Sequence, residues 1–351
     1  MPGGAALRRV TLTTVAQAAG VSVPTVSKVV NGRSDVAPET RARIQQLLKE
    51  HGYAARTPAS ASKDTRTLVM AFDAMRTPNN LEMIRGATEA AAVTGAQVVV
   101  EIVPDEARGT AWVERVVGAH HRGLILVTTR VTRELQMAFC GVGVPVVLID
   151  PVDFPHLDLP SVGATNFNGG LEATEHLLGL GHRRVGFIQG PPDALVSVAR
   201  LHGYSATLSR AGIASDPALL RCGAFTFETG LEAGDELLSL PEPPTAVFAS
   251  NDLQALGVLE AARLHSLRVP EDLSVVGFDD MAPAQWSAPP LTTVRQPFAE
   301  MGRVAIDNLL TLVDGEHLAA PRVELATHLV VRGTTAPRRD VGPGAAAVTG
   351  A

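Results

Sequence analysis

The chain has 351 residues, of which 46% are apolar and 19% charged, and its formal net charge is −6. This length predicts two or three folded domains, and the composition excludes an intrinsically disordered chain. Two cysteines, Cys140 and Cys222, argue against a disulfide framework. The first residues, MPGGAALRRV, lack the apolar core of a secretory signal, and no apolar run reaches membrane-spanning length. We therefore expect a cytoplasmic location and no membrane partner.

The charge is distributed unevenly along the chain. Residues 1–63 carry nine Lys and Arg side chains against three acidic ones, so this part is basic and the remainder is strongly acidic. A basic head on an acidic body predicts that the head contacts a polyanion and the body does not.

Residues 12–52 predict three short helices. Thr11 can cap the first, LTTVAQAA, which stops at Gly20, and Ser22 can cap the second, VPTVSKVVN, with Pro24 in its first turn. The third, PETRARIQQLLKEHG, begins at Pro38. Its predicted apolar face consists of Ile44, Leu47 and Leu48.

The second of these helices has the composition of a helix that reads DNA. Val26, Val29 and Val30 can pack on the first helix, which leaves small polar residues facing outward. Two short helices joined by a tight turn form a helix-turn-helix unit, whose second helix enters the major groove. Hydroxyl and amide groups suit phosphate oxygens, and Lys28 suits a phosphate or a guanine edge. The expected DNA contacts are Thr11, Ser22, Val23, Pro24, Thr25, Ser27, Lys28, Asn31 and Arg56.

Beyond a small, polar and basic linker, apolar runs alternate with helical patterns. The expected strands are residues 67–73, 96–102, 123–129 and 144–150, followed by 183–190, 245–251 and 273–280. Continuous apolar strands separated by helices indicate parallel sheets covered on both faces. The two sets predict an α/β body of two doubly wound lobes behind a small all-α head.

The segments VTLTTVAQAAGVSVPTVSKVVNG, SVGATNFNGGLEATEHLLGLGHRRVGFIQG, ASNDLQALGVLEAA, VPEDLSVVGFDD and PPLTTVRQP resemble the LacI/GalR family of bacterial repressors, in family order. The resemblance runs from about Val10 to Arg332. It implies a body like that of periplasmic sugar-binding proteins, a homodimer, a palindromic DNA operator and a small effector between the lobes. The effector implied is a sugar, either a mono- or a disaccharide, acting as inducer or as corepressor, and no cofactor or metal is implied.

Composition and the resemblance together divide the chain into domains. We expect a DNA-binding domain over 1–53, a hinge linker over 54–66, an effector-binding and dimerisation domain over 67–335 and, from its low-complexity sequence, a disordered tail over 336–351. Within the third domain, the N-lobe is expected over about 67–165 and 295–323, and the C-lobe over about 166–294 and 324–335.

Ligands of open α/β sheets bind at the carboxyl ends of the strands. Asn251 and Asp279 end two expected strands, and Arg200 and Phe225 match the effector-binding arginine and the ring-stacking aromatic that the resemblance implies. The expected effector site consists of Arg200, Phe225, Asn251, Asp279, Gln296, Asp150, Thr128 and Asp73. Polyol hydroxyls need such acceptors and donors around an aromatic face.

Each of these residues also has a structural explanation. Asn251 or Asp252 can cap the following helix, and Asp280 can be structural. Arg200 can form a surface ion pair, and Phe225 can belong to a core. The resemblance favours the binding interpretation for Arg200, Asn251 and Asp279.

Other function classes lack their motifs. No G-x-G-x-x-G follows a strand and no phosphate-binding G-x-x-x-x-G-K-[ST] occurs, which argues against a nucleotide-dependent enzyme. GVSVP has proline where a hydrolase elbow needs glycine. His176 and His182 lack metal-ligand spacing. A secreted sugar-binding protein would share the body but not the helix-turn-helix head.

Two departures from the family pattern carry expectations of their own. The family's minor-groove leucine lies nine residues after the tyrosine closing the third helix, which here is Ser62, and AARTPASASKD holds no leucine. We expect a weaker DNA kink at the operator centre, although Pro58 or an alanine could act as a smaller wedge. No leucine heptads follow Arg332, which predicts a dimer rather than a tetramer.

Overall fold

The computed structural model describes residues 12–30, 36–50, 66–75, 77–103, 107–128, 130–152 and 159–338. The chain divides into two compact units, Met1–Thr65 and Arg66–Ala351, each of which is described here by itself.

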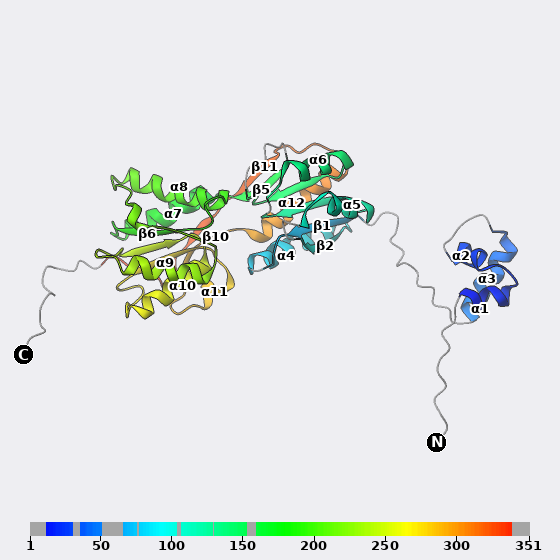
Figure 1. The fold of residues 1–351 in the computed structure, drawn as a ribbon, viewed down its shortest axis with the longest axis horizontal. Helices are drawn as coiled ribbons and strands as arrows, with labels where there is room; N and C mark the ends of the chain where they lie inside the picture. The colour runs from blue at the N-terminus through cyan, green and yellow to red at the C-terminus, as the bar shows by residue number, and fades with distance from the viewer. Residues whose placement is uncertain are drawn as a thin grey trace, which may run out of the picture. The chain divides into compact units, whose positions relative to one another are not determined.

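The first unit contains the three predicted helices (Figure 1). They are α1 (Leu12–Ala19), α2 (Val23–Val30) and α3 (Pro38–Glu50). Val26 and Val29 of α2 are buried with α1, and Ile44 of α3 completes this small core. The predicted cap is confirmed, because the Ser22 hydroxyl accepts a hydrogen bond from the Thr25 amide at 3.4 Å.

Several expectations about the first unit concern parts outside the described residues. These are Thr11, Asn31, Arg56 and the hinge with Pro58 and Ser62. Pro24, Ser27 and Val30 lie in α2, but their side chains are also outside what is described. The expectation about the operator kink therefore stays a prediction.

The second unit consists of two lobes, each built on a six-stranded sheet with helices on both faces (Figure 1). The N-lobe sheet is wholly parallel and has the order β11-β5-β4-β3-β1-β2. Its strands are β1 (Thr67–Phe72), β2 (Gln97–Ile102), β3 (Gly123–Val127), β4 (Val146–Ile149), β5 (Ser161–Ala164) and β11 (Arg322–Leu325). Its helices are α4 (Asn79–Val93), α5 (Thr110–Gly118), α6 (Arg133–Val142) and α12 (Phe298–Val313).

The C-lobe sheet has the order β12-β10-β9-β8-β6-β7. Its strands are β6 (Val185–Gln189), β7 (Leu220–Cys222), β8 (Ala246–Ala249), β9 (Ser274–Asp279), β10 (Thr292–Arg295) and β12 (His328–Val330). Its helices are α7 (Asn166–Gly179), α8 (Leu195–Arg210), the 3-10 turn η2 (Pro217–Leu219), α9 (Phe227–Leu238), α10 (Asp252–Leu264) and α11 (Ala282–Trp286).

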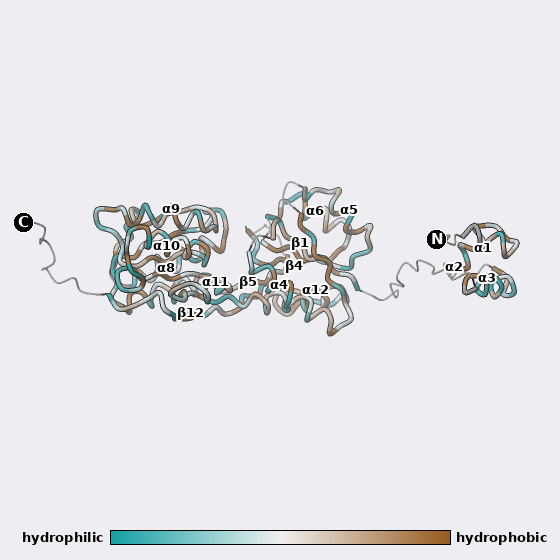
Figure 2. The backbone as a smooth tube through the Cα atoms, turned by 90° about the horizontal axis from the view of Figure 1, so that it is seen from below, coloured by the Kyte–Doolittle hydropathy of each residue, from teal (hydrophilic) through white to brown (hydrophobic). Residues whose placement is uncertain are grey.

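Each lobe has an apolar core on both faces of its sheet. In the N-lobe, α4 and α12 cover one face and α5 and α6 the other. In the C-lobe, α9 and α10 cover one face and α7 and α8 the other. Figure 2 shows apolar residues along the inner strands, for example β1 and β4, as the alternation of strands and helices predicts.

The chain passes between the lobes three times, after β5, after β10 and after β11. These crossings set the lobe boundaries, and two of them lie slightly later than expected. Arg295 still pairs in the C-lobe sheet, and Glu324 and Leu325 still pair with β5 in the N-lobe sheet. The lobe boundaries depend on which strands pair by backbone hydrogen bonds, and the local sequence pattern does not reveal this pairing.

All seven predicted strands are present, which confirms the two-lobe α/β fold. The five further strands, β5, β7, β10, β11 and β12, have only three or four residues each and were not predicted. Two other expectations about the sheets are wrong. The last strand, β12, runs antiparallel to β10, and β2 is not covered on both faces.

Strand β2 differs from the expectation because it is an edge strand. Val99 and Val100 are each 37% exposed and Ile102 is 58% exposed. An apolar run alone does not distinguish a central strand from an edge strand.

The tail was expected to start at residue 336, but the chain still contacts the C-lobe there. Ala336 donates its backbone N–H to the Ser274 hydroxyl at 3.1 Å, and Arg338 donates its backbone N–H to the Leu180 carbonyl at 2.8 Å. The backbone N–H groups of Ala336 and Arg338 therefore hold this part of the chain to the C-lobe. The following residues, 339–351, lie outside the described part.

Candidate effector site between the lobes

The carboxyl ends of strands from both lobes converge on a cavity of about 140 Å³. We call this space the inner cavity. Its lining consists of Thr77, Asn79, Asn80, Met83, Thr128, Asp150, Val196, Arg200, Phe225, Asn251, Asp279, Gln296 and Phe298. Convergence follows from the parallel order of both sheets, since parallel strands end at one edge.

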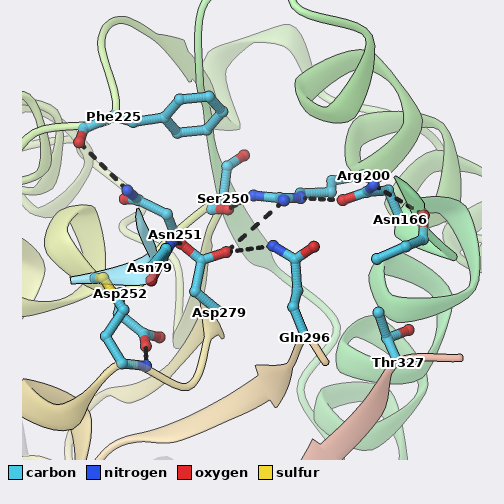
Figure 3. A network of polar contacts seen from close by, with 12 residues as sticks. Asn79, Asn166, Arg200, Phe225, Ser250, Asn251, Asp252, Asp279, Gln296 and Thr327 are labelled. Atoms are coloured by element: carbon cyan, nitrogen blue, oxygen red, sulfur yellow. Dashed lines mark hydrogen bonds and ion pairs between the residues drawn. The ribbon is translucent and has the colours of Figure 1, made fainter. Parts of the chain in front are cut away.

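Arg200 is the buried cation of this site (Figure 3). It lies on α8 and is 3% exposed. Its Nε donates to Oδ1 of Asn166 at 2.8 Å, and its Nη1 donates to the Ser250 carbonyl at 2.5 Å. The guanidinium carbon lies 3.8 Å from the centre of the Phe278 ring. These contacts fix the plane of the guanidinium, as bidentate recognition of a ligand requires.

Asp279 links the two lobes. It ends β9, is 5% exposed, and accepts hydrogen bonds from Nε2 of Gln296 at 2.6 Å and from Nδ2 of Asn79 at 3.1 Å (Figure 3). Asn79 belongs to the N-lobe helix α4, so this contact joins residues 200 positions apart. Oδ1 of Asp279 lies 3.8 Å from Nη2 of Arg200. Burial raises the pKa of Asp279, although Arg200 and these two hydrogen bonds act to lower it.

Asp150 is the second carboxylate at the inner cavity. It follows β4 in the N-lobe. Burial of the carboxyl raises the pKa of Asp150 to about 7, with a further rise from Asp279 and an opposing effect of Arg200. Two carboxylates thus lie near one guanidinium, and one of them titrates near neutral pH.

Asn251 is both a helix cap and a member of the site. Its Oδ1 accepts from the Gln254 backbone N–H at 2.9 Å, which caps α10, and its Nδ2 donates to the Phe225 carbonyl at 3.3 Å. The two interpretations of Asn251 are therefore compatible. The Phe225 ring lies 5.7 Å from the guanidinium carbon of Arg200.

Three residues that line the inner cavity have left-handed backbone conformations. The φ angles are 47° for Thr128, 43° for Asp150 and 112° for Asp279. Such conformations are strained for residues other than glycine, and they cluster at binding sites in proteins. All three residues lie at or just beyond strand ends, where the chain must turn sharply out of the sheet.

Asp252 and Asp280, which follow Asn251 and Asp279 in the sequence, have structural roles. Asp252 is buried and accepts from the Thr293 hydroxyl at 2.5 Å and the Met281 backbone N–H at 2.7 Å. Asp280 forms ion pairs with Arg295 and Arg332 at 2.5 and 2.6 Å. The structural explanation of Asp280 is thus confirmed.

Seven of the eight residues expected in the effector site line the inner cavity, and Asp73 does not. Asp73 is exposed, and its Oδ1 accepts from the backbone N–H of Ala74 at 2.6 Å. Strand β1 ends at Phe72, one residue before Asp73, and the exposed Asp73 is not part of the cavity lining.

Sequence reasoning missed the residues that follow β1 and β10. Asn79 and Asn80 begin α4, and Phe298 begins α12. The rule that ligands bind beyond strand ends could have found them, because each lies in the first helix turn after a strand. Asn166, the partner of Arg200, begins α7 and carries no comparable signal.

The inner cavity offers hydrogen-bond donors, acceptors and aromatic faces. Within the described residues, Oε1 of Gln296 is buried without a hydrogen-bond partner, which makes it an acceptor for a ligand. No cluster of three or more potential metal ligands occurs in the described ranges. The arrangement is suited to binding hydroxyl groups, because donors, acceptors and aromatic side chains line one space.

Two family models match the chain. Residues 11–55 match "Bacterial regulatory proteins, lacI family", and residues 174–335 match "Periplasmic binding protein-like domain". The regulator CelR of Thermobifida fusca is 36% identical over 339 residues, covering 93% of this chain and 98% of CelR. The repressor CytR of Escherichia coli K12 is 34% identical over 328 residues, covering 93% of this chain and 96% of CytR. The chain belongs to the lacI family of bacterial regulatory proteins.

Solved structures of lacI-family regulators have the same fold. CelR in complex with cellobiose superimposes with a TM-score of 0.71 at 34% identity, covering 93% of this chain and 100% of that one. The lac repressor dimer, bound to operator and the anti-inducer ONPF, gives a TM-score of 0.72 at 30% identity, covering 94% and 100%. These relatives are transcriptional regulators. This chain is likewise a transcriptional regulator and not an enzyme. None of its described helices is both long and apolar enough to span a membrane.

Proposed function

We propose that this lacI-family regulator represses transcription from a palindromic operator as a homodimer, and that a small neutral sugar bound in the inner cavity controls its affinity for DNA. The observation that carries the effector half is that Asp279 of one lobe accepts a hydrogen bond from Asn79 of the other lobe and forms an ion pair with Arg200. A ligand at this position contacts both lobes at once. It can therefore change the angle between them.

The charges at the inner cavity favour a neutral ligand. Two carboxylates, Asp150 and Asp279, face one guanidinium, Arg200. A phosphorylated or acidic sugar would add a negative charge beside these two carboxyl groups in a poorly solvated site, which costs free energy. The solved complex of CelR with cellobiose, a neutral disaccharide, supports this class of effector.

The head supplies the DNA-binding half of the proposal. Val23 is 38% exposed and Lys28 is exposed on α2, as a helix that reads base edges requires. Thr25 is half-buried, and its hydroxyl lies 2.8 Å from that of Ser22 at the start of α2. The solved lac repressor dimer on its operator supports the homodimer and the palindrome, since a two-fold dimer needs a two-fold site.

The effector half is tested with Arg200→Lys and Asp279→Asn. Each keeps most of the side-chain volume but removes the bidentate donor or the carboxylate charge. We expect each substitution to weaken the effector response of operator binding by at least about tenfold, because a charge-assisted hydrogen bond is lost. The measurement is operator affinity by fluorescence anisotropy during titration with neutral mono- and disaccharides.

Asp73→Asn is the matched control, since Asp73 is an exposed aspartate outside the inner cavity. Operator affinity without sugar should be unchanged in all three variants. A normal sugar response in both Arg200→Lys and Asp279→Asn would contradict the assignment of the effector site.

The DNA-binding half is tested with Lys28→Ala. If Lys28 pairs with a guanine edge, its loss should weaken operator binding by about 1–3 kcal/mol and relax the base preference at one position. Arg43→Ala, an exposed residue of α3 expected at the phosphate backbone, should instead weaken operator and random DNA alike. Equal losses on both DNAs for Lys28→Ala would reassign Lys28 to a phosphate.

A further inference from the structure

A salt bridge and a backbone hydrogen bond join the two lobes at one loop of the C-lobe, between β6 and α8. Nη2 of Arg130, which follows β3 in the N-lobe, lies 2.5 Å from Oδ2 of Asp193 in this loop. The backbone N–H of Leu195, the first residue of α8, donates to the carbonyl of Val152, which follows β4, at 3.0 Å. We call these two contacts, Arg130–Asp193 and Leu195–Val152, the clasp.

The clasp lies at the rim of the inner cavity. Each of its residues is within three positions of a residue in the cavity wall, and these wall residues are Thr128, Asp150 and Val196. The inner cavity measures about 140 Å³, which is below the roughly 300–1,000 Å³ usual for ligand pockets. A ligand therefore needs the lobes to separate, and the contacts at the rim have to break before they can.

Stiff segments hold both partners of the salt bridge. Two prolines directly precede Asp193, and the Ala194 N–H closes the turn by donating to the Pro191 carbonyl at 3.1 Å. Arg130 precedes Val131, which is 5% exposed in the N-lobe core. Two ends that are already ordered lose less conformational entropy on pairing than two mobile ends do.

The salt bridge is exposed, so its effect on closure is moderate and depends on salt. The side chains of Arg130 and Asp193 are 43% and 61% exposed. Exposed ion pairs contribute little to stability, and dissolved salt screens them. Because the two charges belong to different lobes, their attraction favours only the closed arrangement and shifts the equilibrium between closed and open lobes.

We propose that the clasp holds the ligand-free lobes closed over the inner cavity, and that the effector enters only when the clasp opens. Arg130 and Asp193 then determine how often the cavity is accessible, and they make this frequency depend on ionic strength. The inference rests on the proposed function for the identity of the ligand that enters, and it adds a control on that ligand's access. Closure itself is a property of the ligand-free chain, so it can be measured without any sugar.

The test measures how often the inner cavity opens, from the rate at which a thiol inside it reacts. Cys140 and Cys222 are exposed and are replaced by serine, and Met83→Cys then places one thiol at the cavity wall, where Met83 is 3% exposed. The reagent is N-ethylmaleimide, because a neutral molecule is not attracted or repelled by the charges at the rim. When closing is faster than reaction, the labelling rate is proportional to the open population.

Asp193→Lys and Arg130→Glu each replace the attraction between the lobes by a repulsion. We expect each to raise the labelling rate about two- to tenfold, as the reversal of an exposed ion pair allows. The double variant with both substitutions should return the rate to within about twofold of the unmodified pair, because opposite charges face each other again. Added salt should raise the rate for the unmodified pair and lower it for either single variant.

Asp314→Lys is the matched control. Arg66 and Asp314 form an ion pair at 2.9 Å with exposures of 41% and 45%, but both flank elements of the N-lobe, β1 and α12. Reversing this charge should leave the labelling rate unchanged, since the pair does not act between the lobes. Thermal melting of every variant checks that the fold is intact.

The outcomes separate this inference from the proposed function. Equal labelling rates for the unmodified pair and both single variants would overturn the clasp. A rate that the double variant fails to restore, or that Asp314→Lys raises equally, would overturn it as well, and the proposed function would stand in each case. If the labelling pattern is as expected but no sugar alters operator binding, the effector assignment is contradicted and the clasp stands.

Discussion

At the scale of single residues, the effector site depends on a few side chains held in unusual settings. Arg200 is buried yet touches an amide, a backbone carbonyl and an aromatic ring, so its charge is compensated from several sides. Burial outweighs the attraction of Arg200 and a backbone hydrogen bond at Ala164 in setting the pKa of Asp150, and the residue has a left-handed backbone. A carboxyl in this position is a source of pH dependence.

The pKa of Asp150 predicts how the stability of the body depends on pH. In the unfolded chain the pKa of this carboxyl group is about 3.9, whereas burial raises it to about 7 in the folded protein. Between these values the folded state binds a proton that the unfolded state has lost, so the stability contributed by Asp150 falls as pH rises across this window.

Asp150→Asn should therefore remove part of the pH dependence. We expect the melting temperature of the unmodified chain to fall more than that of Asp150→Asn between about pH 5 and about pH 7. Thermal unfolding followed by circular dichroism measures it, with the exposed Asp73→Asn as control. Parallel pH profiles for the chain and Asp150→Asn would show that Asp150 ionises normally.

At the scale of secondary-structure elements, helix pairs are positioned by glycines at their crossings. Where α7 crosses α8, a Cβ atom on Gly170 would lie 2.5 Å from the Arg200 carbonyl oxygen, and one on Gly203 would lie 2.3 Å from the Phe167 carbonyl oxygen. The same close approach occurs between α4 and α12 and between α9 and α10. In the first pair, the contact sets the position of Arg200.

Gly170→Ala should displace α8 from α7. We expect a loss of about 1–3 kcal/mol in the free energy of unfolding, because the added methyl group meets rigid backbone, together with weaker sugar binding through the displaced Arg200. Gly179→Ala in the same helix has no atom within 4 Å of the new Cβ and should be neutral or slightly stabilising. Urea denaturation and calorimetry measure both effects; equal stability of the two variants would contradict this prediction.

At the scale of the whole molecule, the exposed apolar edge of the N-lobe needs a partner. Strand β2 ends the sheet order, and Val100 and Ile102 lie on one face of it, 37% and 58% exposed. Nearby on the preceding helix α4, Val93 is 88% exposed. Edge strands of this kind invite pairing or packing with another chain. The homodimer proposed above supplies such a partner as a second copy.

Val100→Lys combined with Ile102→Lys should shift the dimer towards monomers. Two charges at an apolar interface would be desolvated without partners, so we expect the dimer dissociation constant to rise by at least about a hundredfold. Sedimentation velocity measures it. Met137→Lys, on the exposed side of α6 with a 65% exposed side chain, should leave the dimer intact. A dimer of unchanged affinity in the double variant would place the interface elsewhere.

Much of the fold follows from local patterns in the sequence. The seven predicted strands, the three head helices and the cap at Ser22 could be predicted because periodicity and capping act over a few residues. Short strands such as β7 and β12 gave no pattern long enough to detect. The edge position of β2 was missed since it depends on strand order.

Most of the effector site also follows from the sequence, for a reason that is partly topological. Parallel strands bring their carboxyl ends to one edge, so Asp150, Asn251 and Asp279 could be placed together before their contacts were known. The match of Arg200 and Phe225 to a family pattern added the residues that lie on no strand end.

Only the tertiary structure decided which groups pair across the cleft. The hydrogen bond from Asn79 to Asp279 joins the two lobes and residues 200 positions apart, and the one from Arg200 to Asn166 joins α8 to the first residue of α7 within the C-lobe. The inner cavity likewise depends on how the two lobes meet, because its lining comes from both. The local sequence determines which helix or strand each segment forms. Contacts between distant segments depend on the packing of the whole chain, because the burial and geometry that favour them involve residues from several segments.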